Sequence, residues 1–446
     1  MDDCIAAIAT SLGTNAISII RVSGKDSIEI VDKIFSGNLK NKESHTITYG
    51  YIKDKDKKID EVLVSIFKAP KSFTAENVVE INCHGGIATT KKVLELLLLN
   101  GCRQAQAGEF TKRAFLNGRI DLTKAEAVQD LINAKSENAR KIIMNNLEGK
   151  TSSKIKELRQ KLRSIISNIE VNIDYPEYLD IEEMTREKII DNLDYIKENL
   201  NSIIENSKNS KVIKDGINVA IIGRPNVGKS SILNKLLKED KAIVTDVAGT
   251  TRDIVEGKAV IDGILLNFID TAGIRKTDDK VEQIGVTKSL NELSNANLII
   301  LVLNNNEPLT EEDKYLLNLT EDKKRIIVVN KNDLENKLQI KEDVITTNTN
   351  SYEGIESLIN KIKEMFNLDK IDTDDFNYVS NVEQIAKLEE ARQSLIDIET
   401  SLKNDMPIDI IEIDIKNIWT ILGEILGETY TEELLDNLFK DFCVGK

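Results

Sequence analysis

One run of eight residues has the composition and spacing of a phosphate-binding loop. It reads Gly223-Arg224-Pro225-Asn226-Val227-Gly228-Lys229-Ser230, between an apolar run at 219–222 and a helical pattern at 231–237. In a strand–loop–helix setting, the glycines let backbone N–H groups face a phosphate, and the helix N-terminus adds partial positive charge. Lys229 could then contact the β- and γ-phosphates, and the Ser230 hydroxyl could bind Mg²⁺. The segment therefore predicts a site for a nucleoside triphosphate.

Two later motifs indicate which base is bound. Asp270-Thr271-Ala272-Gly273 follows a predicted strand at 264–269, where a carboxylate could hold Mg²⁺ through water and Gly273 would approach the γ-phosphate. Asn330-Lys331-Asn332-Asp333 follows a predicted strand at 326–329. Asp333 could accept the hydrogens that guanine presents at N1 and N2, a pair that adenine lacks. The order of these motifs predicts GTP binding and hydrolysis.

The predicted GTP contacts fall in four segments, and Thr251 is the expected switch threonine on Mg²⁺, beside Ser230. The contact residues are Asn226, Val227, Gly228, Lys229, Ser230, Ser231, Thr245, Asp246, Val247, Ala248, Gly249, Thr250, Thr251, Asp270, Thr271, Ala272, Gly273, Asn330, Lys331 and Asp333.

The residue that orients the hydrolytic water is not evident from the motifs. Ile274 follows Gly273, at the position where Ras-like GTPases carry a glutamine. The polar groups that could replace it are Arg252, Arg275 and Glu282, although Glu282 can also be explained as a solvated residue of a charged loop. The side-chain oxygen of Asn226 offers another aid to hydrolysis, because it could hold a monovalent cation beside the phosphates.

The composition limits the other functions. The chain has 446 residues, a net charge of −15, four scattered cysteines and two histidines. This balance argues against a broad nucleic-acid-binding face, which needs clustered lysine and arginine, and it excludes a histidine-rich metal site. No signal-peptide pattern and no apolar run of about 18 residues occur, so we expect a cytoplasmic protein without a membrane span.

Hydrophobic periodicity predicts a multidomain chain of mixed α/β and α+β class. Short apolar runs and turns predict an α+β domain at 1–118, and the period-3.6 pattern of 119–215 predicts helices that Tyr175-Pro176 interrupts. A P-loop domain should span 216–375, and helical periodicity returns at 376–446. We therefore expect a Ras-like nucleotide domain inserted into an all-helical domain.

Two segments outside the P-loop domain also suggest chemistry. Cys443-Val444-Gly445-Lys446 follows a predicted helix at 431–442 and could bring a thiol and an amine into a site, although a frayed end explains it as well. Glu80-Ile81-Asn82-Cys83-His84-Gly85-Gly86 predicts either close approach of the backbone to another group or an ordinary strand-to-helix turn.

Over essentially its full length, the chain resembles the bacterial tRNA-modification GTPase family (MnmE, also called TrmE). The segments that carry the resemblance are Ile5–Thr10, Ile19–Gly24, Ser72–Glu76, Cys83–Gly86, Gly108–Arg119 and the Cys-x-Gly-Lys ending in Phe442–Lys446. The resemblance implies a homodimer in three parts: a tetrahydrofolate-binding and dimerisation domain, a helical domain and a mobile GTPase domain. It implies no membrane contact.

The resemblance also implies a reaction. With an FAD-dependent partner protein (MnmG), expected in a heterotetramer, the family adds aminomethyl-type groups to C5 of the wobble uridine of certain tRNAs. The one-carbon donor would be 5,10-methylenetetrahydrofolate, with 5-formyltetrahydrofolate as an analogue. By position, Arg21, Glu80, Arg119 and Lys446 would line the folate site, and Cys443 would take part in the uridine chemistry.

For the GTPase, the resemblance implies that K⁺ takes the role that an arginine finger has in other GTPases. The ion would be held by Asn226, Thr245, Val247 and Thr250, while Glu282 would orient the water and Lys229 would act on the phosphates. Asn348-Thr349-Asn350 departs from the family's usual base-contacting Ser-Ala-Lys. Two other hypotheses stay open at this point: a ribosome-assembly GTPase, and a scaffold whose GTPase only switches conformation.

Overall fold

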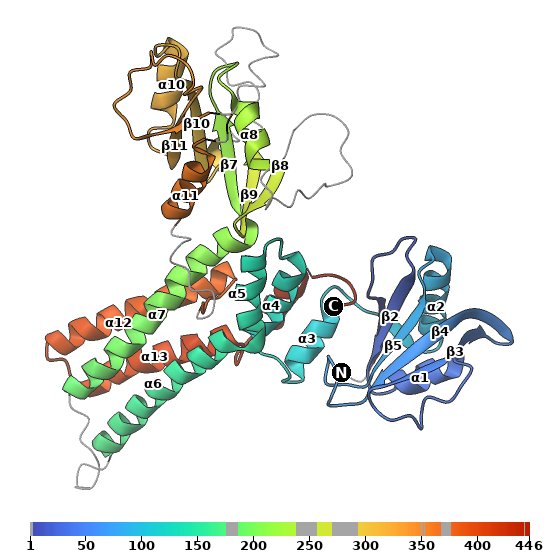
Figure 1. Cartoon of the computed structure of the whole chain (residues 1–446). Coiled ribbons are helices and arrows are strands. Elements are labelled where there is room, and N and C mark those ends of the chain that lie inside the picture. Colours follow the sequence, from blue (N-terminus) through green and yellow to red (C-terminus); the bar gives the residue numbers. More distant parts are fainter. Residues whose placement is uncertain are drawn as a thin grey trace. The chain divides into compact units, whose positions relative to one another are not determined.

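The structure is a computed structural model that describes residues 3–174, 186–237, 257–269, 293–348, 351, 353–366, 376–440 and 442–446 (Figure 1). The chain divides into two compact units, each made of segments distant in sequence. One contains Met1–Ile132, Asn146–Leu200 and Asn381–Lys446, and the other contains Asn133–Asn145 and Asn201–Ser380. The second unit interrupts the first, as an inserted nucleotide domain would. The finer boundaries at residues 118, 215 and 375 stay a prediction.

A mixed sheet forms the N-terminal part of the first unit. Its strand order is β3-β4-β5-β2-β1-β6, in which only the β1–β6 pair is parallel. Alternation of buried and exposed residues directs one face toward helices α1 and α2, where Val64 and Ile81 join a core with Val31 and Leu97. The bounds are β1 Cys4–Ile8, β2 Ile17–Ser23, α1 Ser27–Ile34, β3 Thr46–Asp54, β4 Lys57–Phe67, β5 Val78–His84, α2 Ile87–Leu99 and β6 Cys102–Gln104.

Gly85 and Gly86 link β5 to α2, and their surroundings explain why glycine stands there. A Cβ on Gly85 would lie 2.3 Å from the carbonyl oxygen of Asn15. Gly85 therefore permits a close approach to the backbone of Asn15, just before β2, which is the first of the two alternatives given for this segment.

The other described helices of the first unit are α3 Glu109–Leu116, α4 Leu122–Asn133, α6 Lys150–Asp174, α12 Val382–Lys403, α13 Ile408–Leu426 and α14 Glu432–Lys440. Helix α7 Arg186–Asp215 runs from the first unit into the second, and most of α5 Glu137–Glu148 belongs to the second. Segments from both sides of the insertion pack together, α13 lying against α6 and α12. Arg159 of α6 stacks over the ring of Trp419 in α13 at 4.3 Å and donates from Nε to the Trp419 carbonyl at 3.1 Å. None of the described helices has both the length and the apolar character that a bilayer span requires.

The second unit contains a sheet of order β12-β11-β10-β7-β9-β8, parallel except for β8. Its strands are β7 Ile217–Ile222, β8 Gly257–Ile261, β9 Ile264–Ile269, β10 Leu298–Asn304, β11 Arg325–Asn330 and β12 Val344–Thr347. The helices described within this nucleotide-domain part are α8 Lys229–Leu237, α10 Glu311–Leu319 and α11 Ile355–Met365. In such a sheet the loops at the carboxyl ends of the strands form the ligand site.

Candidate functional site

The predicted phosphate loop connects β7 to α8, and its shape depends on two glycines. Gly223 has φ +147° and Gly228 has φ +105°; a Cβ on Gly228 would lie 2.0 Å from Nδ2 of Asn330. Asn330 uses that amide to donate to the Val227 carbonyl at 2.9 Å. The close approach fastens the phosphate loop to the end of β11, so the first and last nucleotide motifs lie side by side.

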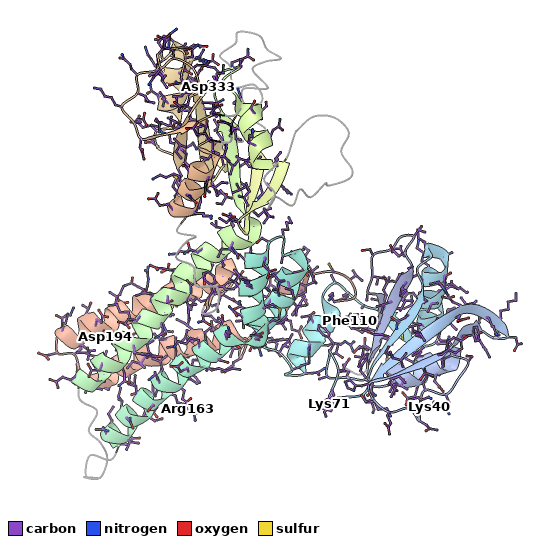
Figure 2. The ribbon with its side chains drawn as sticks, in the orientation of Figure 1. Lys40, Lys71, Phe110, Arg163, Asp194 and Asp333 are labelled. Atoms are coloured by element: carbon purple, nitrogen blue, oxygen red, sulfur yellow. The ribbon has the colours of Figure 1, made fainter. Side chains whose placement is uncertain are left out.

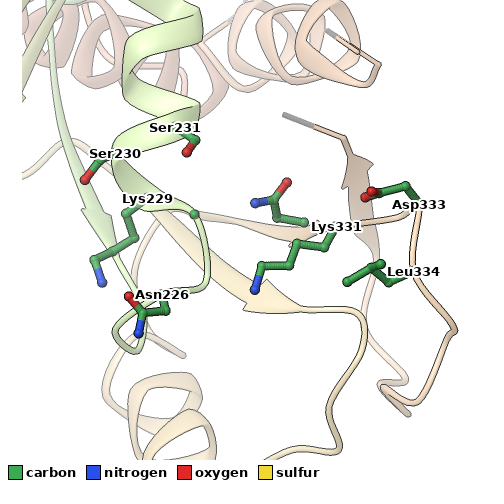
Figure 3. A pocket seen from close by; sticks show the side chains of 9 residues that line it. Asn226, Lys229, Ser230, Ser231, Lys331, Asp333 and Leu334 are labelled. Atoms are coloured by element: carbon green, nitrogen blue, oxygen red, sulfur yellow. The ribbon is translucent and has the colours of Figure 1, made fainter. Parts of the chain in front are cut away.

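Nine residues from these two segments line a cavity of about 640 Å³: Asn226, Gly228, Lys229, Ser230, Ser231, Asn330, Lys331, Asp333 and Leu334. Figure 3 shows Asn226, Lys229 and Ser230 on one side of it, with Lys331 and Asp333 on the other. Lys229 Nζ donates to the carbonyls of Gly223 and Arg224, both at 2.7 Å. The cavity thus has cationic and backbone donors at one end and the Asp333 carboxylate at the other.

A second cluster of predicted site residues lies on the N-terminal sheet. Arg21 of β2 is paired with Glu80 of β5, with Nε and Oε1 2.9 Å apart. Arg119 donates to the Phe73 carbonyl at 2.9 Å. The guanidinium carbons of Arg21 and Arg119 lie 5.5 and 5.1 Å from the centroid of the Phe73 ring. Two cations therefore lie against one aromatic side chain.

The 443–446 segment is held against this cluster. Arg21 Nη1 donates to the Gly445 carbonyl at 3.0 Å, and Val444 forms an antiparallel bridge with Ala107. Gly108 N donates to the Cys443 carbonyl at 3.3 Å. These backbone contacts argue against a frayed end and bring Lys446, one residue beyond Gly445, near Arg21 and Glu80.

Both clusters occur in regions that match known proteins. Residues 4–119 match the family model for the GTP-binding protein TrmE N-terminus, and residues 122–443 match the model for the MnmE helical domain. The chain is 49% identical over 455 residues to the tRNA modification GTPase MnmE of Bacillus cytotoxicus, covering 100% of this chain and 99% of that protein. The chain belongs to the MnmE family of tRNA modification GTPases. The corresponding proteins of Bacillus licheniformis and Staphylococcus epidermidis are 47% and 46% identical over 458 and 456 residues, again with 100% of this chain covered and 100% and 99% of theirs.

Several residues that an MnmE-family GTPase is expected to use lie outside the described residues. They are Thr245, Asp246, Val247, Ala248, Gly249, Thr250 and Thr251 of the switch segment, Asp270, Thr271, Ala272 and Gly273, and the predicted water-orienting Glu282. Arg252 and Arg275 lie there too, as do Thr349 and Asn350 of the base-contacting loop. Their assigned roles stay predictions.

The thiols differ sharply in their surroundings. Cys4, Cys83 and Cys102 are buried, whereas Cys443 is exposed. Burial raises the pKa of each of the three buried thiols, that of Cys102 to about 12. Among the four cysteines, Cys443 is therefore the one that solvent and a substrate can reach.

The sequence prediction for this MnmE-family chain missed two residues beside the sites. Phe73 belongs to the Ser72–Glu76 segment, but nothing in its spacing predicts that two arginines lie against its ring. Arg224 occupies an unspecified position of the P-loop pattern, and its partners Glu307 and Asp313 follow it by more than 80 residues. Phe73 and Arg224 could therefore be identified as part of the sites only from the folded structure.

Proposed function

We propose that the chain is a K⁺-stimulated GTPase that works with an FAD-dependent partner protein (MnmG). Together they would add an aminomethyl-type group to C5 of the wobble uridine of certain tRNAs, using a tetrahydrofolate one-carbon unit. The observation that carries the folate half of this proposal is the hydrogen bond between Arg21 and Gly445. The guanidinium that receives the 443–446 segment is also paired with Glu80, and this supports a shared site in a chain that has a nucleotide cavity as well.

In the nucleotide half, the lining of the cavity supports the proposed roles. Lys229 would contact the β- and γ-phosphates, and Asp333 would accept hydrogen bonds from guanine. Lys229 and Asp333 line the same cavity, which supports both roles. Ser230, with Thr251, would bind Mg²⁺, and Asn226, with Thr245, Val247 and Thr250, would hold K⁺. Asn226 is exposed and has φ 63°, which leaves its side chain on the surface of the loop beside the cavity. Glu282 would orient the hydrolytic water.

In the folate half, the chemistry of the cluster fits the ligand. A reduced folate combines a flat, hydrogen-bonding pterin with anionic glutamate carboxylates. Glu80 could accept pterin N–H groups, while Arg21, Arg119 and Lys446 supply cations for carboxylates. Phe73 offers an apolar face beside both guanidinium groups. Bound folate would supply the one-carbon unit, and Cys443 would present its thiol to the uridine.

The proposal includes a homodimer, with tRNA and the FAD-dependent protein as further partners in the cytoplasm. Support for the dimer comes from the face of the N-terminal sheet that α1 and α2 leave uncovered. Ile47 and Tyr49 of β3, Leu63 of the adjacent β4 and Ile17 of β2 in the same sheet are 66%, 59%, 47% and 59% exposed. Apolar side chains gathered on one sheet face are typical of an interface.

Calorimetric titration with 5-formyltetrahydrofolate tests the proposal. The full chain should bind saturably, and deletion of Lys446 should weaken binding because one cation near the glutamate carboxylates is lost. Lys440→Ala is the matched control, since it removes an exposed lysine of α14. Failure of the intact chain to bind the folate would reject the folate half of the proposal. Normal tRNA modification by Cys443→Ser would instead favour a chain that only switches conformation.

A further inference from the structure

Arg224 lies in the phosphate loop but is not among the residues that line the nucleotide cavity. Its side chain is only 17% exposed. Nε donates to Oδ1 of Asp313 at 2.9 Å, and Nη2 donates to Oε2 of Glu307 at 2.9 Å. A charged group in this position connects the loop to the protein rather than to a ligand.

Asp313 uses its second carboxylate oxygen to hold the start of α10. Oδ2 accepts from the backbone N of Thr310 at 3.0 Å and from its hydroxyl at 2.8 Å, which completes a capping box. The Asp313 side chain is only 2% exposed. One buried carboxylate therefore joins the phosphate loop to the N-terminal turn of α10.

Glu307 extends the connection toward the opposite side of the cavity. Its Oε1 accepts from Nδ2 of Asn304 at 2.7 Å, at the end of β10. The neighbouring Asn305 accepts at its carbonyl from the backbone N of Lys337 at 2.9 Å and of Leu338 at 3.2 Å. Its side chain donates to the Leu334 carbonyl at 3.2 Å. The Asn304–Glu307 loop thus contacts both Arg224 and the segment that carries Asp333.

We infer that Arg224 is a positioning residue that, together with the Asn330–Val227 contact, fixes the spacing between the phosphate loop and the guanine-binding segment. A bound nucleotide joins its base to its phosphates at a limited range of distances, so both ends bind well only when the two protein segments keep that spacing. The fork of a guanidinium can hold Glu307 and Asp313 at once, which a single ammonium group cannot reproduce. The inference rests on the proposed contact between Asp333 and guanine.

The test compares the binding of GDP with that of IDP. The base of IDP lacks the 2-amino group from which Asp333 would accept a hydrogen bond. With the full chain, Arg224→Gln should weaken GDP binding. It should also reduce the preference for GDP over IDP by roughly tenfold, because the phosphate loop and the guanine-binding segment are coupled. Arg224→Lys should recover part of that preference. Arg325→Gln is the matched control: Arg325 is 15% exposed, pairs with Glu342 and starts β11, at the end of that strand opposite Asn330.

A merely stabilising role for Arg224 predicts a different result. Both arginine variants would then lower the melting temperature, and Arg224→Gln would weaken GDP and IDP by the same factor, which would overturn the inference. Equal binding of GDP and IDP by the unmodified chain would reject the Asp333 assignment and the inference together. Should Arg224→Gln fail to fold, Glu307→Gln provides the same comparison at a carboxylate that is 48% exposed.

Discussion

A hydrogen bond of 3.0 Å joins Nη1 of Arg21 to the carbonyl oxygen of Gly445, across 424 positions of sequence. The same guanidinium is held by Glu80 on the neighbouring strand. The pairing of β2 with β5 therefore positions the donor that receives the 443–446 segment. In this way the register of an N-terminal sheet determines where the 443–446 segment is held.

Gly445→Ala should displace this segment and weaken folate binding. Gly445 has φ +94°, and a Cβ there would lie 2.7 Å from the Ile8 carbonyl oxygen, so the substitution forces the backbone to shift. Gly118→Ala is the control: Gly118 also has positive φ, +70°, but its Cβ would meet nothing within 4 Å. Calorimetry with 5-formyltetrahydrofolate should show clear loss of affinity for the first variant and near-normal affinity for the second. Equal affinities would mean that the segment does not contribute to the folate site.

Ellman's reagent should modify one thiol quickly in the native protein and all four after unfolding. The expected fast thiol is Cys443, because it is exposed, while burial both hides the other three and raises the pKa of each. Cys443→Ser should abolish the fast phase and leave the slow one. Two or more fast thiols in the native chain would contradict the described burial.

The imidazole of His84 should titrate above pH 6.5. A hydrogen bond of 2.7 Å between its Nδ1 and Asp60 Oδ1, with the charge of that carboxylate, raises its pKa. The stabilisation from this pair is complete below pH 6.5 and is lost as the pH rises through the raised folded-state pKa. Proton NMR can follow it, since the chain has only two histidines. Asp60→Asn should lower the His84 pKa, and an unchanged titration would reject the pairing.

Arg159→Met should reduce the free energy of unfolding by about 1–3 kcal/mol, because it leaves the Trp419 carbonyl and Glu428 without their donor and removes the stack on the Trp419 ring. Trp419 is the only tryptophan, so its fluorescence reports unfolding of the helices around it. Arg163→Met changes an exposed arginine on the same helix and should have a much smaller effect (Figure 2). Equal effects would show that the stack contributes little.

The sequence predicted the elements that carry the nucleotide site, because local rules determine them. Apolar runs located β7, β9 and β11 to within two residues, and the ends of parallel strands explain why the phosphate loop lies beside Asn330. Asp333 follows from the same rule, on the loop after β11 (Figure 2).

Long-range backbone pairing could not be predicted in the same way. Helical periodicity extended the last helix to Phe442, but α14 ends at Lys440. Phe442 instead packs with Phe115 and Phe439, and the following residues extend toward Ala107. Neither this pairing nor the position of the arginines beside Phe73 corresponds to a periodic pattern of residues in the sequence. Only the resemblance to the family indicated that Arg21 and Lys446 belong together.

The contact between Arg21 and Gly445 also has a consequence for biosynthesis. Translation adds about 5–20 residues per second, so the N-terminal sheet emerges from the ribosome on the order of tens of seconds before residues 443–446 exist. During that interval Arg21 has its Glu80 partner but not the Gly445 carbonyl. The surface beside them is completed only when residues 443–446 have been added, so a nascent chain that has not reached them lacks the groups contributed by that segment.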